Sequence, residues 1–195
     1  MTKINQLVNN WPRGSIKTVK ELAELGYTPQ LLKVYANSKW IELTGRGMYK
    51  LFGDEVTWEG ILYGLQKKNK TTLHAGGKTA LNLKGYSHYI NLVEKKIYFF
   101  SDRAQNFNSW FQKNEQITLN RTKIFNYENE TYFTDHNTGN FKIKISTPEL
   151  AMMEVLYLLP KEQSFDEAIK LVEGLTTLRP ELVQQLLEDC QSVKI

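Results

Sequence analysis

The feature that most constrains the fold is a change of hydrophobic period near residue 40. Before it, apolar residues recur at the three- and four-residue spacing of helices. After it, Trp40–Thr44 and Met48–Leu51 are typical of two short strands, joined by the glycine-bearing loop Gly45-Arg46-Gly47. A chain that changes period in this way is expected to place its helices before a β-hairpin.

Three helices are predicted ahead of that hairpin. The first covers residues 2–10. The second follows a capping box, Thr18 with Glu21 three residues later, and stops at Gly26. The third covers residues 29–39, because Thr28 can cap it and proline suits its first turn. The order helix, helix, tight turn, helix, hairpin is that of a winged helix-turn-helix.

The rest of the chain predicts a mixed domain. A helix starts at Trp58, a further helical turn follows Lys78, and the last 50 residues are helical, with starts at Thr147, Ser164 and Pro180. Strand-like runs lie between them, at 89–93, 96–100, 116–119, 123–125, 131–134 and 141–145. We therefore predict an α+β fold: an N-terminal winged helix-turn-helix at 1–52, then a mixed α/β domain at 53–195 with a helical C-terminal part.

Composition excludes several classes of protein. No run of about 18 apolar residues exists, so no membrane span is predicted. The polar start lacks the apolar stretch of a signal peptide. Cys190 is the single cysteine, so no disulfide can form within the chain, as expected in a reducing cytoplasm.

Charge is unevenly distributed along the sequence. Residues 1–55 hold eight basic and five acidic side chains, a net charge of +3, whereas residues 145–195 hold four and nine, a net charge of −5. Basic surface attracts polyanions such as duplex DNA. DNA would repel the acidic tail, which we expect to face a protein or solvent.

The third helix carries the predicted DNA-reading residues. Gln30, Lys33 and Asn37 are spaced i, i+3 and i+7, which places them on one helix face. Glutamine and asparagine can bond adenine in bidentate fashion, and lysine suits guanine or phosphate. Arg46 at the hairpin tip can enter a minor groove or meet phosphate. The full predicted DNA-binding set is Arg13, Lys17, Lys20, Thr28, Gln30, Lys33, Asn37, Arg46 and Lys50. Winged-helix modules also dock proteins, and that alternative stays open.

Motifs that would carry chemistry are incomplete. Gly76-Gly77-Lys78-Thr79 resembles the end of a phosphate-binding loop, but Thr72 stands where that loop needs glycine. The three histidines lack metal-site spacing. Glu149 and Glu154 are interpreted as helix-terminus and surface charges rather than an acid–base pair. We therefore predict no catalytic residue, no metal and no cofactor.

Three segments occur together in an order that resembles a known family. They are Leu22-Ala-Glu-Leu-Gly26 with Leu31-Leu-Lys33, the wing Gly45-Arg-Gly-Met-Tyr49, and His74-Ala-Gly-Gly-Lys-Thr-Ala-Leu81 followed by Gly85. Together they resemble the AbiE-type antitoxins of type IV toxin–antitoxin (abortive infection) systems, over roughly residues 4–160.

The resemblance implies a two-domain antitoxin. Its winged helix would repress its own operon at inverted repeats, with Arg46, Gln30, Lys33 and Asn37 as DNA contacts. Its larger domain would counter a nucleotidyltransferase-like toxin without a stable complex. Family members extend beyond the position of Ile195, so we expect a shortened C-terminal domain here. Two alternatives remain: a protein-interaction module or regulator with no toxin partner, and an enzyme that modifies nucleic acid.

Overall fold

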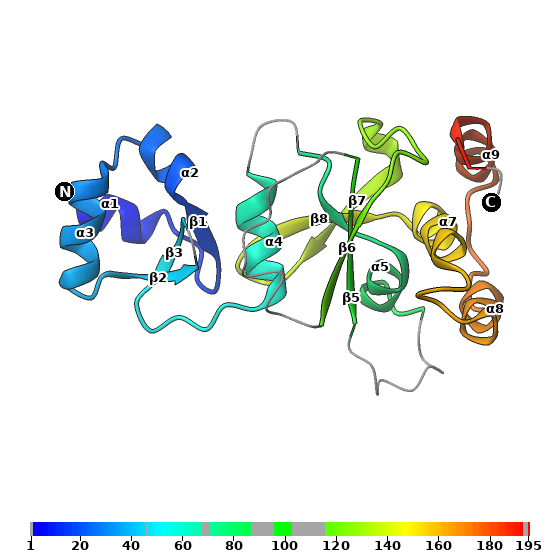
Figure 1. Ribbon diagram of the computed structural model, residues 1–195, viewed down its shortest axis with the longest axis horizontal. Helices are drawn as coiled ribbons and strands as arrows, with labels where there is room; N and C mark the ends of the chain where they lie inside the picture. The colour runs from blue at the N-terminus through cyan, green and yellow to red at the C-terminus, as the bar shows by residue number, and fades with distance from the viewer. Residues whose placement is uncertain (1, 46, 68–70, 87–95, 103–115, 193–194) are drawn as a thin grey trace. The chain divides into compact units, whose positions relative to one another are not determined.

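The computed structural model describes residues 2–45, 47–67, 71–86, 96–102, 116–192 and 195. These fall into two compact units (Figure 1). The first holds the described residues up to Thr71 together with 137–143, and the second holds the other described residues. The predicted division at residue 52 stays a prediction.

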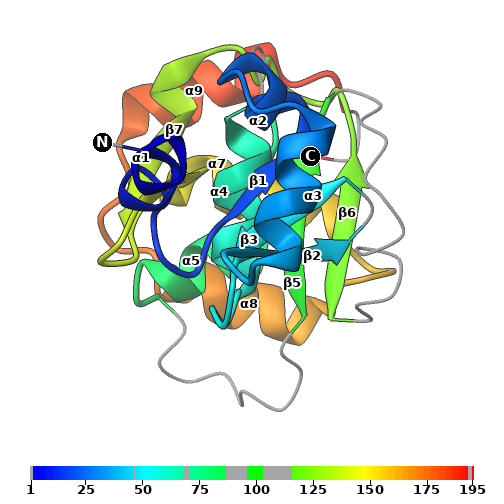
Figure 2. The ribbon, with the colours of Figure 1, turned by 90° about the vertical axis from the view of Figure 1, so that its left-hand side faces the viewer.

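The first unit begins with the three predicted helices and the predicted hairpin, and a further short strand lies between the first two helices. Its elements are α1 Lys3–Asn9, β1 Ile16–Thr18, α2 Val19–Glu24, α3 Pro29–Asn37, β2 Ile41–Gly45, β3 Met48–Leu51 and α4 Trp58–Gln66. The strands form an antiparallel sheet in the order β1-β3-β2, which Figure 2 shows from another side. The sequence prediction lacked β1, because a three-residue strand leaves no periodic signal.

Apolar side chains from all three N-terminal helices meet the hairpin in one core. Its buried members are Leu7, Trp11, Leu22, Tyr27, Leu32, Ile41 and Leu51. Helix α4 packs against β1, and its two glycines lie at the contact. A Cβ on Gly64 would lie 2.5 Å from the Ile16 carbonyl oxygen, and one on Gly60 would overlap the Gly14 carbonyl. Glycine at both positions therefore permits the close approach of α4 to β1.

A five-stranded mixed sheet in the order β6-β5-β4-β8-β7 follows, and most of its residues belong to the second unit. Its strands are β4 His74–Ala75, β5 Ile97–Ser101, β6 Ile117–Arg121, β7 Phe133–Asn137 and β8 Lys142–Ser146. Strand β4 pairs with β5 in antiparallel and with β8 in parallel, and β5 pairs with β6 in parallel. The α+β class is thus confirmed.

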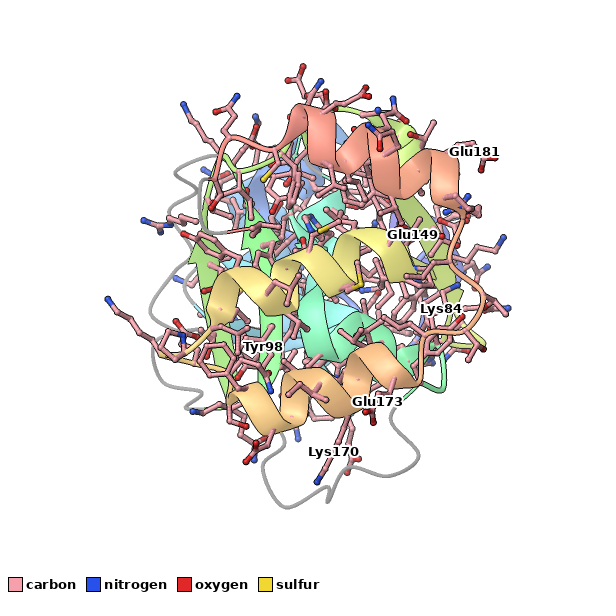
Figure 3. All side chains as sticks on the ribbon, turned by 90° about the vertical axis from the view of Figure 1, so that its right-hand side faces the viewer. Lys84, Tyr98, Glu149, Lys170, Glu173 and Glu181 are labelled. Carbon is pink, nitrogen blue, oxygen red and sulfur yellow. The ribbon has the colours of Figure 1, made fainter. Side chains whose placement is uncertain are left out.

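Helices accompany this sheet: α5 Gly77–Leu83, the short 3-10 helix η1 Glu130–Tyr132, α7 Pro148–Leu158, α8 Phe165–Glu173 and α9 Pro180–Asp189. Figure 3 shows α7 lying between α8 and α9. The Tyr132 hydroxyl donates to the Asp189 carboxylate of α9. Burial and then this hydrogen bond raise the pKa of Tyr132 to about 12.

One predicted strand is wrong, one lies outside the described residues, and the run at 131–134 is a strand only from Phe133, because η1 extends to Tyr132. Residues 123–125 are irregular, with a bend at 124–125, and do not form a strand. Their apolar pattern has another cause, since Ile124 and Phe125 are buried in the core of the second unit and the Gln191 amide donates to the Ile124 carbonyl. The run at 89–93 lies outside the described residues.

Candidate nucleic-acid interface

Helix α3 begins where local chemistry predicts it. Thr28 has extended backbone angles, and its hydroxyl accepts a hydrogen bond from the Leu31 amide at 3.3 Å. Pro29 takes the first helical position, where a missing N–H costs no hydrogen bond. Gly26 has a φ of +82°, a left-handed conformation that glycine adopts without strain, and so it allows the tight turn after α2.

The inner face of α3 holds the helix on the core of the first unit. Leu32 is 1% exposed, and Leu31, Tyr35 and Ala36 pack against the same cluster. The Tyr35 ring lies 6.5 Å from that of Tyr27. Burial raises the pKa of Tyr27, and its hydroxyl donates to the Lys3 carbonyl. These contacts fix the rotation of α3 about its axis, and with it the residues that face outward.

The outward face of α3 consists of Gln30, Lys33, Val34 and Asn37, all of them exposed. Gln30, Lys33 and Asn37 are the residues that the sequence predicts to read DNA. Two amide groups and one ammonium group can thus reach a ligand along two helical turns without disturbing the core. Whether that ligand is DNA stays a prediction.

Three of the predicted phosphate contacts form ion pairs within the first unit. Arg13 Nη1 lies 2.7 Å from Asp54 Oδ1, Lys17 Nζ lies 2.5 Å from Glu21 Oε1, and Lys50 Nζ lies 3.0 Å from Glu42 Oε1. The Lys50 hydrogen bond lowers the pKa of Glu42. Their charges are therefore already partly compensated, and that reduces what each can contribute to phosphate binding.

The other predicted contacts differ in exposure. Lys20 is 78% exposed, and its ammonium group lies 3.8 Å from Glu24 across one helical turn. Thr28 is exposed but its hydroxyl is used as the cap of α3. Arg46 lies outside the described residues. Lys20 and Lys33 are thus exposed cations, and Lys20 is not held in an ion pair as short as those of Arg13, Lys17 and Lys50.

The glycine-rich segment after β4 belongs to a buried polar network in the second unit. Glu154 Oε1 lies 2.7 Å from His74 Nε2, and Glu154 Oε2 accepts from the Gly77 amide at 2.8 Å and from Ser146 Oγ at 2.7 Å. His74 Nδ1 lies 2.7 Å from the Thr72 carbonyl, to which it can only donate. His74 and Glu154 are both 0% exposed. This network is closed to a substrate, and it joins β4, β8, α5 and α7.

Glycine is required at this network by the closeness of Glu154. A Cβ on Gly76 would overlap a Glu154 carboxylate oxygen and lie 2.6 Å from Phe100 Cδ2. Gly77 has a φ of +52°. Burial, followed by the charge of Glu154, raises the pKa of Tyr127 well above its usual value. The resemblance of this segment to a phosphate loop therefore reflects packing around a carboxylate.

The interpretation of Glu149 and Glu154 as surface charges is wrong, although Glu149 does lie at a helix terminus. Glu154 lies in the buried network, and Glu149, at the first turn of α7, is 1% exposed. Burial alone would raise the pKa of Glu149, but hydrogen bonds from the Arg179 guanidinium and amide lower it. Sequence spacing gave no signal for either partner, since His74 is 80 residues and Arg179 is 30 residues away.

No three His, Cys, Asp or Glu side chains gather as a metal site among the described residues. Over the same residues, no helix is long and apolar enough to span a bilayer.

Comparisons with known proteins cover both units. Residues 1–92 match the family model "Transcriptional regulator, AbiEi antitoxin N-terminal domain". Residues 94–195 match "Transcriptional regulator, AbiEi antitoxin, Type IV TA system". A search of curated proteins gives no match. The crystal structure of the Rv2827c protein from Mycobacterium tuberculosis has a similar fold, with a TM-score of 0.61 and 13% identity, over 96% of this chain and 70% of that chain. The chain therefore belongs to the AbiEi family of transcriptional-regulator antitoxins of type IV toxin–antitoxin systems.

Proposed function

We propose that residues 1–52 form a winged helix-turn-helix that binds operator DNA and represses transcription. The observation that carries this proposal is the outward face of α3. Gln30, Lys33 and Asn37 are exposed on it, while Leu32 on the opposite side is buried. Helix α2 precedes it across a tight turn and the β2–β3 hairpin follows, the order of elements that winged-helix DNA readers use.

In this proposal α3 lies in the major groove. Gln30 and Asn37 bond adenine edges, and Lys33 bonds guanine or phosphate. Thr28 and the cations Arg13, Lys17, Lys20 and Lys50 contact the DNA backbone, where they position the module without reading sequence. Arg46, which lies between β2 and β3 in the sequence, enters a minor groove or meets phosphate. Arg13, Lys17 and Lys50 exchange their present carboxylate partners for phosphate oxygens, so their net contribution is smaller than that of a free cation.

The second unit, in the same proposal, counters a nucleotidyltransferase-like toxin in the cytoplasm without forming a stable complex. Family membership supports this role, together with the net charge of −5 over residues 145–195, which DNA would repel. The protein represses its own operon at inverted repeats and carries out no chemistry of its own.

Protein docking by the first unit is the second candidate function. The observation in its favour is exposed apolar surface: Leu25 is 54%, Trp40 46% and Leu43 61% exposed. Exposed apolar side chains of this size are common at protein interfaces, although scattered ones also occur on ordinary surfaces. The same binding experiment separates the two candidates, since a docking module has no preference for a duplex.

The test is a titration of the full chain against the duplex upstream of its own gene and against an unrelated duplex, at two salt concentrations. Specific binding should weaken steeply with salt, with a logarithmic slope of about −0.9 for each phosphate contact. Equal and negligible binding to both duplexes would contradict the proposal. For the antitoxin role, cells that express the neighbouring nucleotidyltransferase should grow only when this protein is also present.

A further inference from the structure

Val34 is the one apolar side chain on the outward face of α3. It is 56% exposed, although the other apolar residues of the helix's middle turns pack on the core. It follows Gln30 by four residues and precedes Asn37 by three, so these three side chains share one patch of the helix surface.

Folding gives no reason for valine at this position. A β-branched side chain loses rotamer freedom in a helix, and at 56% exposure Val34 recovers little of that cost by burial. Single exposed apolar residues are common, so exposure alone carries no conclusion. What distinguishes Val34 is its place between two amide side chains that can both hydrogen-bond adenine.

The major-groove edge of an A·T pair matches this patch chemically. Adenine offers N6 and N7, which glutamine and asparagine bond in bidentate fashion. Its thymine partner offers the C5-methyl group, which is recognised by apolar contact. A helix face with one carboxamide on each side of a valine therefore presents groups that complement both the adenine and the thymine of an A·T pair.

We propose that Val34 is a specificity-determining residue that packs against a thymine C5-methyl group, so that the operator half-site contains A·T pairs beneath α3. This inference rests on the proposed DNA-binding function.

The test begins with the full chain and a library of random duplexes, from which bound sequences are selected. A·T pairs should be enriched in the recovered site. Each thymine of the recovered duplex is then replaced by deoxyuridine, which lacks only the C5-methyl. At one position the affinity should fall about fourfold, the factor expected for one buried methyl group.

Variants at Val34 then test whether this residue contacts the thymine methyl group. Val34→Ser removes both side-chain methyl groups and should bind the thymine and deoxyuridine duplexes equally well. Val34→Thr keeps one methyl and the branched shape, so it should retain a preference for thymine. Val172→Ser, the same change at a 41% exposed valine on α8, is the matched control and should retain the full preference.

The outcomes separate the two claims. Failure to select any preferred duplex overturns both the DNA-binding proposal and the role of Val34. A preferred duplex whose thymine preference is unchanged in Val34→Ser overturns the role of Val34 alone. Circular dichroism of each variant confirms that it remains folded, and Val34→Asn, which also removes both methyl groups, takes the place of Val34→Ser if that variant unfolds.

Discussion

Replacing Glu154 with alanine should strongly destabilise the second unit, because three buried polar groups would lose their hydrogen-bond partner. These groups are His74 Nε2, the Gly77 amide and Ser146 Oγ, at 2.7, 2.8 and 2.7 Å from the Glu154 carboxyl group. The Ser146 and His74 residues are 0% exposed, so water cannot replace the carboxylate without local opening.

The magnitude follows from those three contacts. Each buried polar group left without a partner costs about 1–3 kcal/mol. The Ser146 hydroxyl can rotate to another acceptor, so we expect a total of about 3–5 kcal/mol, the usual loss on breaking a buried pair. A loss of that size should lower the thermal midpoint by about 10 °C or more.

Glu154→Gln should cost less than about 2 kcal/mol. Its amide oxygen can still accept from Gly77 and Ser146, and its NH₂ group can donate to Nε2 of a neutral His74.

The assay is thermal and urea unfolding followed by circular dichroism, with wild type, Glu154→Ala and Glu154→Gln compared at neutral pH. Glu173→Ala, on the exposed side of α8 (Figure 3), is the matched control and should change stability by only about 0.5 kcal/mol. A loss below about 1 kcal/mol for Glu154→Ala would refute the reasoning, since the network would then contribute no more than one ordinary hydrogen bond.

Three further predictions concern other contacts. Arg179→Ala should lower stability by about 1–2 kcal/mol at neutral pH. Because the pKa of Glu149 is lowered in the folded protein, the stability that its charge contributes is present above its ordinary pKa and is lost as the pH falls through its folded-state pKa. Urea unfolding near pH 3 should therefore show a smaller difference in stability between wild type and Arg179→Ala. Gly64→Ala, which would stabilise a free helix, should instead destabilise the first unit by about 1–3 kcal/mol in urea unfolding, because its Cβ meets Ile16. Lys33→Ala combined with Asn37→Ala should abolish operator binding in a gel-shift titration yet leave protection of toxin-expressing cells intact; loss of both activities would mean that they share one surface.

Interactions between residues close in sequence explain why the helix starts and the exposed face of α3 could be predicted. Thr18, Thr28, Thr147 and Ser164 each cap the helix that follows, because a hydroxyl and the free amide three residues later are close along the chain. The positions of these helices follow from such short-range signals. The exposed face of α3 follows equally, since its spacing alone sets which residues share a side.

Long-range pairings account for what the sequence does not predict. Glu154 and His74 are 80 residues apart, and nothing in either segment indicates that the carboxylate will be buried. Lys78 likewise pairs with Glu167 of α8, a contact that only the folded second unit creates. Residues 123–125 show the opposite error, since buried apolar side chains in an irregular segment imitate a strand.

The most direct test of DNA reading by α3 compares discrimination rather than affinity alone. Affinities are measured for the selected duplex and for a duplex with one base pair changed, using wild type, Lys33→Ala, Asn37→Ala and Lys20→Ala. Lys33→Ala and Asn37→Ala should each lose about 1–3 kcal/mol on the selected duplex and relax discrimination at one position. Lys20→Ala, at an exposed backbone-contact position, should weaken both duplexes alike. If Lys33→Ala and Asn37→Ala also weaken both duplexes equally, α3 does not read sequence and the central claim is contradicted.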